Sequence, residues 1–536
     1  MPLLKTETSA AELARALEAF LAEHPRAAVL EDGRVLFEMQ TTRYALSAEH
    51  GRCVLHFWSE ERNVVRTVTN LDARKNVLRI ETRRFGQSKP QTLQLIPDRD
   101  TRTPTTREST RKKYLRLLER VLARSFPDFN IDSLGNAIDL EHSFGPAYAR
   151  GMLARGPKAW AVIAVNAEET QATIDGTLTL GILWLAYGRE HSGGRRVFEG
   201  LKVIVPAGAA AVTRGRMAWL NPALAKWELY ELDERCETLD FAEIGDEGNL
   251  DIRLVHNFNR ERTLERSQAA VDRLLALLPD GMKPHTEIRP LSSSEISFRL
   301  HGLEFARIRH GVAAGSFARQ DTITFGAGAN ETPLNPETVD LFRDLIQRVY
   351  DGRFAGGSVR NPLYRLQPER WLESELRQGL AELEPAIHEE FVYVQVPAFA
   401  GGDRGMIDLL SVTRSGRLMV IELKANEDLH LPLQGLDYWL RVRQVHAAGE
   451  LQKHGYFNGV ELSGEPPLLM LVAPALRIHP ANETVLRYLK PEVDWTLLAL
   501  DEHWRQRRRV IFRKRSERAF LVEWSHKQAD SSLLSE

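Results

Sequence analysis

The sequence is poor in the features that mark secreted, disulfide-bonded and membrane-spanning proteins. Among its 536 residues only two are cysteines, Cys53 and Cys236, which lie far apart. Such a pair excludes a disulfide framework and a cysteine-based zinc site, so we expect a reducing, cytoplasmic setting. The longest apolar run, Thr177 to Tyr187, covers about half of a membrane span. We therefore expect no membrane partner, and the charged, amphipathic first residues predict no secretory signal.

An excess of charge of one sign is also missing, because the formal net charge is only −2. The basic residues are nevertheless concentrated in two stretches, with an acidic stretch from Glu228 to Asp251 between them. The first stretch includes Arg66, Arg74, Lys75, Arg79, Arg83, Arg84, Lys89, Arg111, Lys112, Lys113, Arg116 and Arg120. The second includes Arg505, Arg507, Arg508, Arg509, Arg513, Lys514, Arg515 and Arg518. Local basic faces on a near-neutral protein favour a polyanionic partner, and a solvated helix or strand face is the equally good alternative for either stretch.

The length and the changes of pattern predict a multidomain protein of α+β and α/β class. A glycine-rich linker, DGRFAGGSVRNPLYRLQ, precedes the last of the large units. The segment GMLARGPK lacks the Lys-Ser/Thr end of a phosphate-binding P-loop, so we expect no ATPase motor. The predicted parts are a β-rich N-terminal lobe with a basic helix (1–130), a mixed α/β middle domain (131–285), a strand and helix connector with linker (286–366), a C-terminal domain (367–526) and a frayed tail (527–536).

Two predicted strands of the C-terminal domain are apolar except for single acidic residues. In RLMVIELK, Glu422 interrupts the run from Leu418 to Leu423, and in GMIDLLSV, Asp408 does the same. Continuous apolar runs are typical of strands covered on both faces, where an unpaired charge is costly. The short connection TRSG predicts an antiparallel hairpin in which Asp408 and Glu422 converge. Lys424 follows Glu422 by two residues and so lies on the same face.

These three residues together predict a site for a hard divalent cation. Carboxylate oxygens suit Mg²⁺ or Mn²⁺, which keep open positions for water and a substrate phosphate. Such an ion polarises a phosphoryl oxygen and acidifies a bound water. Lys424 would then orient that water or neutralise charge that develops in the transition state.

The helices on either side of the hairpin supply further candidates. In HLPLQGLDYWLRV, Gln434 and Tyr438 are four residues apart and share one helical face, from which both could hydrogen-bond phosphate or the ligands. In the upstream helix PERWLESELRQGLAEL, Glu369 falls inside the apolar stripe and Glu373 lies at its edge. The stripe consists of Leu372, Leu376, Leu380 and Leu383. We predict that Glu369 or Glu373 completes the metal site, and the sequence leaves the choice open.

Each motif is weak by itself. A Glu and Lys pair on one face is usually a surface salt bridge worth about 0–1 kcal/mol. The ordered set is more specific: a helix acid, an Asp that interrupts a strand, Glu-x-Lys at the end of the next strand, then Gln-x-x-x-Tyr on the following helix. We therefore interpret Asp408, Glu422, Lys424, Gln434 and Tyr438 as catalytic candidates.

The segment GMIDLLSVTRSGRLMVIELK, with LQGLDY after it, resembles the catalytic core of the PD-(D/E)XK nuclease superfamily. The Gln-x-x-x-Tyr element is similar to the RecB-like branch, and the interval from Asp408 to Glu-x-Lys is similar to that of NucS-type endonuclease domains. The resemblance implies a restriction-endonuclease-like mixed sheet flanked by helices. It also implies that Asp408 and Glu422 bind the metal, that Lys424 assists the attacking water, and that Glu369, or else Glu373, is the helix glutamate. The resemblance covers less than a third of the chain, so mismatch specificity is not transferred.

The function expected from this set is a deoxyribonuclease that depends on Mg²⁺ or Mn²⁺ and acts as an endonuclease in repair or phage defence. The expected partner is nucleic acid, DNA rather than RNA, whose phosphates the basic stretches would contact without reading sequence. A homodimer or a partner protein is compatible with this hypothesis. Two alternatives stay open: a catalytically silent nucleic-acid-binding protein of nuclease fold, and a scaffold subunit that docks a partner through its acidic middle region.

Overall fold

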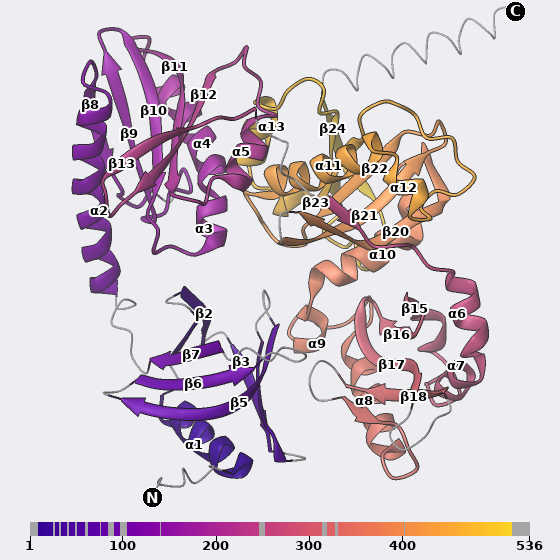
Figure 1. The fold of residues 1–536 in the computed structure, drawn as a ribbon. Coiled ribbons are helices and arrows are strands. Elements are labelled where there is room, and N and C mark those ends of the chain that lie inside the picture. Colours follow the sequence, from indigo (N-terminus) through magenta and orange to yellow (C-terminus); the bar gives the residue numbers. More distant parts are fainter. Residues whose placement is uncertain are drawn as a thin grey trace, which may run out of the picture. The chain divides into compact units, whose positions relative to one another are not determined.

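The computed structural model divides the chain into two compact units, Met1–Lys113 and Tyr114–Glu536, which we describe separately. The described residues are 9–24, 27–31, 34–39, 42–48, 51–58, 63–74, 77–83, 91–96, 104–139, 141–245, 252–312, 319–326, 331–400 and 403–516. Lys75, Arg84, Lys89 and Arg518 of the basic stretches, the end of the acidic stretch and the predicted tail 527–536 lie outside them. The fold is mixed α/β with several sheets (Figure 1).

The first unit is an antiparallel sheet with one helix on one face. Helix α1 (Ala10–Glu23) begins at a capping box, in which Ser9 and Glu12 satisfy each other's backbone amides. Its buried leucines pack on alternate residues of the sheet. The strands are β1 (Ala28–Glu31), β2 (Arg34–Glu38), β3 (Arg43–Ser47), β4 (Cys53–Trp58), β5 (Asn63–Arg74), β6 (Val77–Arg83) and β7 (Gln91–Ile96), in the order β2-β1-β7-β6-β5-β4-β3.

The second unit begins with a six-stranded sheet in the order β13-β12-β11-β10-β9-β8. Its strands are β8 (Asn130–Gly135), β9 (Tyr148–Arg155), β10 (Lys158–Val165), β11 (Val197–Pro206), β12 (Lys226–Asp233) and β13 (Thr238–Ala242). The strands β10, β11 and β12 are parallel to one another. β10 and the second half of β11 are almost continuously buried, because helices cover both faces of the sheet there. Helix α4 (Thr177–His191) packs on one face, with α3 (Gln171–Asp175) and α5 (Ala211–Met217) nearby.

The basic helix α2 (Pro104–Ser125) covers the other face of this sheet. Its buried Tyr114, Leu118 and Val121 form one core cluster with Trp160 and Val162 of β10. The sequence pattern predicted this helix as part of the N-terminal lobe, 1–130. Its apolar side is instead fixed by long-range contacts with the six-stranded sheet.

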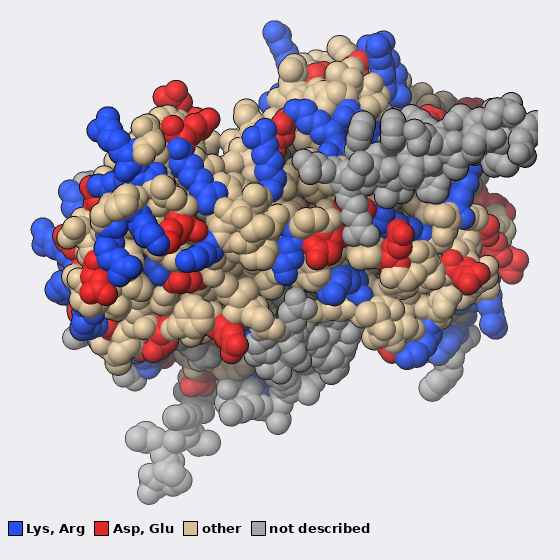
Figure 2. All heavy atoms as spheres, turned by 90° about the horizontal axis from the view of Figure 1, so that it is seen from above, with Lys and Arg blue, Asp and Glu red and all other residues tan. Residues whose placement is uncertain are grey.

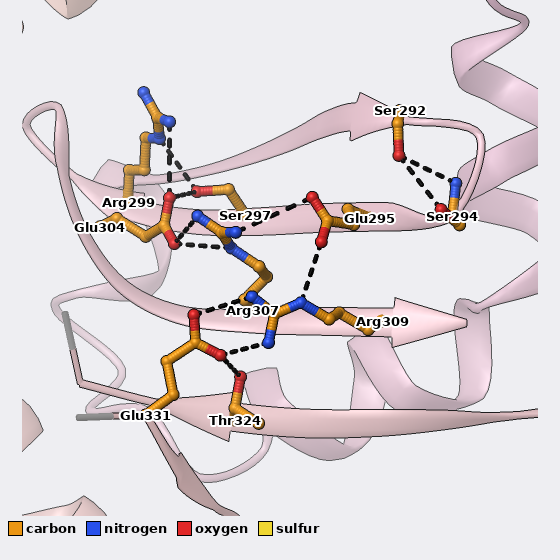
Figure 3. Close-up of polar contacts among 10 residues, drawn as sticks. All are labelled: Ser292, Ser294, Glu295, Ser297, Arg299, Glu304, Arg307, Arg309, Thr324 and Glu331. Atoms are coloured by element: carbon orange, nitrogen blue, oxygen red, sulfur yellow. Dashed lines mark hydrogen bonds and ion pairs between the residues drawn. The ribbon is translucent and has the colours of Figure 1, made fainter. Parts of the chain in front are cut away.

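A five-stranded antiparallel sheet follows, preceded by α6 (Arg260–Arg266) and α7 (Gln268–Leu275). Its strands are β15 (Thr286–Ser292), β16 (Glu295–Leu300), β17 (Leu303–Val312), β18 (Arg319–Phe325) and β19 (Thr332–Pro333). One face is apolar and packs against α7 and α8 (Val339–Gly352). The other face carries a ladder of ion pairs, in which Arg307 bonds Glu304 at 2.6 Å and Arg309 bonds Glu295 at 2.9 Å (Figure 3).

The segment predicted to be a linker is held in place by hydrogen bonds from one buried side chain, Arg353. Its guanidinium donates to the carbonyl oxygens of Leu300, His301, Leu363 and Leu366, at 2.6 to 3.1 Å. It also lies 4.6 Å from the ring centroid of Trp371. The short helix α9 (Pro362–Arg365) and the start of the next helix are therefore fixed to the five-stranded sheet.

The C-terminal sheet has seven strands in the order β14-β20-β21-β22-β23-β24-β25. They are β14 (Ile252–Leu254), β20 (Ile387–Ala400), β21 (Asp403–Thr413), β22 (Leu418–Leu423), β23 (Leu468–Pro474), β24 (Trp495–Leu500) and β25 (Val510–Arg515). The strands β22, β23 and β24 are parallel, and the other pairs are antiparallel. Helix α10 (Pro368–Leu383) covers one face, and α11 (Leu431–Ala447) covers the other, with α12 (Glu450–Lys453) and α13 (Ala481–Arg487) beyond it.

The six-stranded and the C-terminal sheets share one hydrophobic core cluster, which passes through α4 and α11. Trp219 packs edge-on against Trp439 with their ring centroids 4.9 Å apart. The contact is also polar, since Arg216 makes two hydrogen bonds to Asp437, of 2.9 and 2.7 Å. None of the helices in the described ranges is long and apolar enough to cross a membrane.

Candidate functional site

Asp408 and Glu422 face each other across the hairpin of β21 and β22. Leu409 pairs with Ile421 in this register, so one further step sets Asp408 opposite Glu422. The backbone amide of Leu423 donates to Asp408 Oδ2 at 3.2 Å. The structure therefore brings the two predicted metal ligands together.

Burial of this carboxyl pair changes the protonation of both members. It raises the pKa of Asp408 to about 6, and the charge of Glu373 adds to the shift. Glu422 is only 3% exposed, so burial, followed by the charge of Asp408, raises its pKa well above the ordinary value. A second negative charge is costly here unless a proton or a cation compensates it.

Lys424 lies beside the pair, with its Nζ 3.3 Å from Glu422 Oε1. Burial acts to lower the pKa of Lys424, but the charges of Glu422, Glu369 and Asp408 raise it above its usual range. The side chain therefore remains a cation. Lys424 provides one positive charge for the two acids. When both acids are ionised, one negative charge therefore remains for a bound cation to compensate.

Helix α11 approaches the sheet closely because it has glycine at position 435. A Cβ atom there would lie 2.6 Å from Leu471 Cδ2 and 3.6 Å from the Cβ atom of Glu422. Tyr438, one turn later on α11, has its pKa raised by burial and then by the charges of Glu422 and Asp408. Gln434 directly precedes the glycine, and its buried Oε1 has no hydrogen-bond partner within the described part of the chain.

The two candidate helix acids occupy different environments, and their predicted burial was wrong. Glu373 is the buried one at 4% exposed, whereas Glu369 is half-buried. A helical wheel predicts which face of a helix a residue occupies but not how well that point along the helix is covered. Glu369 lies in the first turn of α10, where it is only half-buried. Glu373 accepts hydrogen bonds from Arg289, Arg370 and Gln395 at 2.8 to 2.9 Å. Its oxygens are thus occupied, while the charge of Glu369 acts on Lys424.

Gln395 is a site residue that the sequence analysis missed. It lies between Val394, paired with Leu409, and Val396, paired with Ile407, so it is the residue opposite Asp408. Its backbone has a φ of 55°, which distorts β20 at this point, and its side-chain amide donates to Glu373 Oε2 at 2.8 Å. The available signal was the same as for Asp408, a polar residue inside an apolar run.

Arg216 is a second residue near the site that the sequence did not indicate, because no pattern in the residues around it marks it. It is 5% exposed and clamps Asp437, the neighbour of Tyr438, through a bidentate ion pair. His430, at the start of α11, contacts Thr179 of α4 at 3.1 Å. The middle region therefore holds the helix that carries Gln434 and Tyr438.

The C-terminal basic stretch is used mainly within its own domain. Arg508 pairs with Glu375 at 3.2 Å, and Arg513 pairs with Glu384 at 3.2 Å. Arg505 stacks on Trp504, with its Cζ 4.1 Å from the ring centroid. On the face shown in Figure 2, basic and acidic side chains are interspersed. These contacts compete with the predicted use of this stretch for phosphate binding.

The chain has no match among the family models or the curated proteins that were searched. Within the described ranges, no group of three or more His, Cys, Asp or Glu side chains is spaced to hold a metal ion. Asp408 and Glu422 still form a pair that fits a hard cation, because Glu422 Oε2 is buried with no hydrogen-bond partner among the described residues. Mg²⁺ commonly uses one or two carboxylates and fills its other positions with water and substrate phosphate.

The raised pKa of Asp408 predicts a pH-dependent stability. The folded state retains a proton that the unfolded chain releases between its ordinary value of 3.8 and about 6. Without divalent cations, the free energy of unfolding should therefore fall as pH rises through this window, and the neutral Asp408→Asn side chain should flatten the fall. Urea unfolding in EDTA from pH 4 to 7 measures this, with the exposed Asp340→Asn as control. An unchanged slope in Asp408→Asn would contradict the assignment.

Proposed function

We propose that this chain is a nuclease that uses Mg²⁺ or Mn²⁺ to hydrolyse phosphodiester bonds in DNA, with its active site in a restriction-endonuclease-like C-terminal domain. The observation that carries the proposal is the arrangement of Asp408 and Glu422, which lie opposite each other at a buried position beside Lys424. Burial raises the pKa of both acids and so favours retention of a proton by the pair. A cation in place of that proton would neutralise both acids. The mixed sheet between α10 and α11 supports the proposed fold.

The proposed chemistry assigns distinct roles to the residues of the site. Asp408 and Glu422 would hold the divalent cation, which when bound polarises the scissile phosphate and facilitates deprotonation of a water. The ammonium of Lys424 would orient the attacking water and stabilise the negative charge of the transition state. Tyr438 and Gln434 would hydrogen-bond a phosphate oxygen or a carboxylate from α11.

The residues around these groups fix their positions. Arg289 and Arg370 hold Glu373, and Glu373 in turn holds the Gln395 amide beside Asp408. On the opposite face, Arg216 holds Asp437 next to Tyr438. Helices on both faces of the sheet are thus anchored by buried arginines, which favours a site of fixed geometry.

The proposal is tested with purified protein and a panel of single-stranded, duplex, branched and mismatched DNA, each with Mg²⁺, Mn²⁺ or EDTA. We expect cleavage of at least one substrate, loss of cleavage in EDTA, and loss in Asp408→Asn and Glu422→Gln. If the wild type cuts no substrate but binds DNA without a metal requirement, the alternative of a binding protein replaces the nuclease. Cleavage that persists in both variants would place the activity elsewhere.

A further inference from the structure

Arg260, the first residue of α6, has an unusual environment for a largely buried guanidinium. Its Cζ lies 5.5 Å from the ring centroid of Tyr393 on β20. Its Nε is buried without a hydrogen-bond partner, and no described acidic side chain pairs with it. Buried charges normally find partners, because an unpaired one pays a large desolvation penalty. The arginines of the neighbouring sheet face follow that rule, since each is paired with a glutamate (Figure 3).

The charged arginines that act on the pKa of Arg260 belong to the elements β15 and α10. Arg377 and Arg289, together with burial as the larger cause, lower the pKa of Arg260. The acids in reach are already occupied, because Arg289 pairs with Glu373 at 2.9 Å and Arg377 pairs with Glu287. The three guanidiniums from α6, β15 and α10 therefore leave a local excess of positive charge.

This excess lies close to the carboxyl pair. Glu373 accepts from Arg289 on one side and from Gln395, the residue opposite Asp408, on the other. Its negative charge contributes to the raised pKa of Asp408. The side chain of Glu373 thus links Arg289 of the cluster to Gln395, the residue opposite Asp408.

We infer that Arg260, with Arg289 and Arg377 beside it, binds a phosphate of the DNA backbone next to the phosphate that is cut. A guanidinium can donate two parallel hydrogen bonds to phosphate oxygens, and one anionic phosphate would supply the negative charge that the cluster lacks. The ring of Tyr393 would hold the guanidinium in position from behind. The identity of the ligand as DNA rests on the proposed function, whereas the anion site rests on the arginine cluster.

The test measures DNA binding rather than cleavage, in EDTA, by fluorescence anisotropy of a labelled duplex and a labelled single strand. We expect Arg260→Gln to raise Kd about tenfold and to lower the slope of log Kd against log salt by about 1, as for the loss of one phosphate contact. Arg262→Gln, on the exposed side of the same helix, is the matched control and should change neither value.

Thermal unfolding of both variants separates binding from folding. If Arg260→Gln unfolds at a much lower temperature, Arg260→Lys keeps the charge and should retain the salt slope of the wild type while losing affinity. The inference is overturned if Arg260→Gln binds like the wild type, if Arg262→Gln weakens binding equally, or if the wild type binds no DNA in EDTA. Failure of cleavage alone would overturn the proposed nuclease but leave the phosphate site at Arg260 standing, because the binding measurement does not depend on the metal.

Discussion

Replacement of Lys424 by alanine is expected to slow DNA cleavage by about 10²- to 10³-fold, the range seen when one preorganised donor to a transition-state charge is removed. The ammonium lies 3.3 Å from Glu422 Oε1 and remains charged because the surrounding acids raise its pKa. Its loss would remove stabilisation of the phosphate charge. It would also raise the pKa of Glu422 further, so residual activity should require a higher pH than wild-type activity.

Rates measured against pH with saturating Mn²⁺ distinguish these two effects of Lys424. Lys453→Ala, an exposed lysine paired with Glu450, is the control and should cleave like the wild type. A merely structural role for Lys424 predicts a lower unfolding temperature with an unchanged pH profile. Wild-type rates in Lys424→Ala would remove this residue from the mechanism.

Replacement of Arg353 by methionine is expected to destabilise the fold by at least about 3 kcal/mol, because several buried carbonyl groups lose their donor. The guanidinium is fully buried and serves carbonyls before and after it in the chain, Leu300 and His301 on one side and Leu363 and Leu366 on the other. Burial, with a smaller contribution from Arg505, lowers the pKa of Arg353 to about 10, so burying the charge is itself costly. The free energy lost with these hydrogen bonds should exceed the free energy gained when the buried positive charge is removed.

Urea unfolding at pH 7 measures the effect, with the exposed Arg360→Met in the same segment as control. Because Arg353 fixes the start of α10, the variant should also weaken the placement of Glu373. A decrease in the free energy of unfolding of less than about 1 kcal/mol would contradict the prediction, because water or other donors would then replace the guanidinium.

The sequence contained enough local information for much of the C-terminal domain. The apolar stripe and Pro368 predicted helix α10 with the bounds observed, Pro368–Leu383. The hairpin of β21 and β22 followed from two apolar runs and a short turn. Asp408 and Glu422 could be selected because each interrupts the apolar pattern of a buried strand, and Lys424 because it follows Glu422 by two residues, just after β22 ends.

Features set by long-range contacts could not be predicted. Strand β14 has only three residues and exists because it pairs with the edge of β20. The burial of Glu373 depends on Arg289, which is 84 residues away, and on a distorted residue in β20, Gln395. The ion pair between Arg216 and Asp437 joins residues 221 positions apart, and no periodicity in either segment indicates it.

The sequence also does not show which basic side chains are paired within the fold. Arg508 and Arg513 follow one another closely in sequence with Arg505, but glutamates of the α10 segment neutralise both of them. Arg260 stands in an ordinary charged segment, NRERTLER, and only the fold shows that it lacks an acid. The density of basic residues in a sequence therefore says little about which of them remain available to a phosphate.

The central claim is that the pair of Asp408 and Glu422, whose pKa values are both raised by burial, exchanges a retained proton for a divalent cation. Calorimetric titration of the DNA-free protein with Mn²⁺ at neutral pH, in buffers of different ionisation enthalpy, measures binding and proton release together. We predict binding by the wild type with release of protons, and at least tenfold weaker binding by Asp408→Asn and by Glu422→Gln. Absence of Mn²⁺ binding by the wild type, or equal binding by both variants, would contradict the claim.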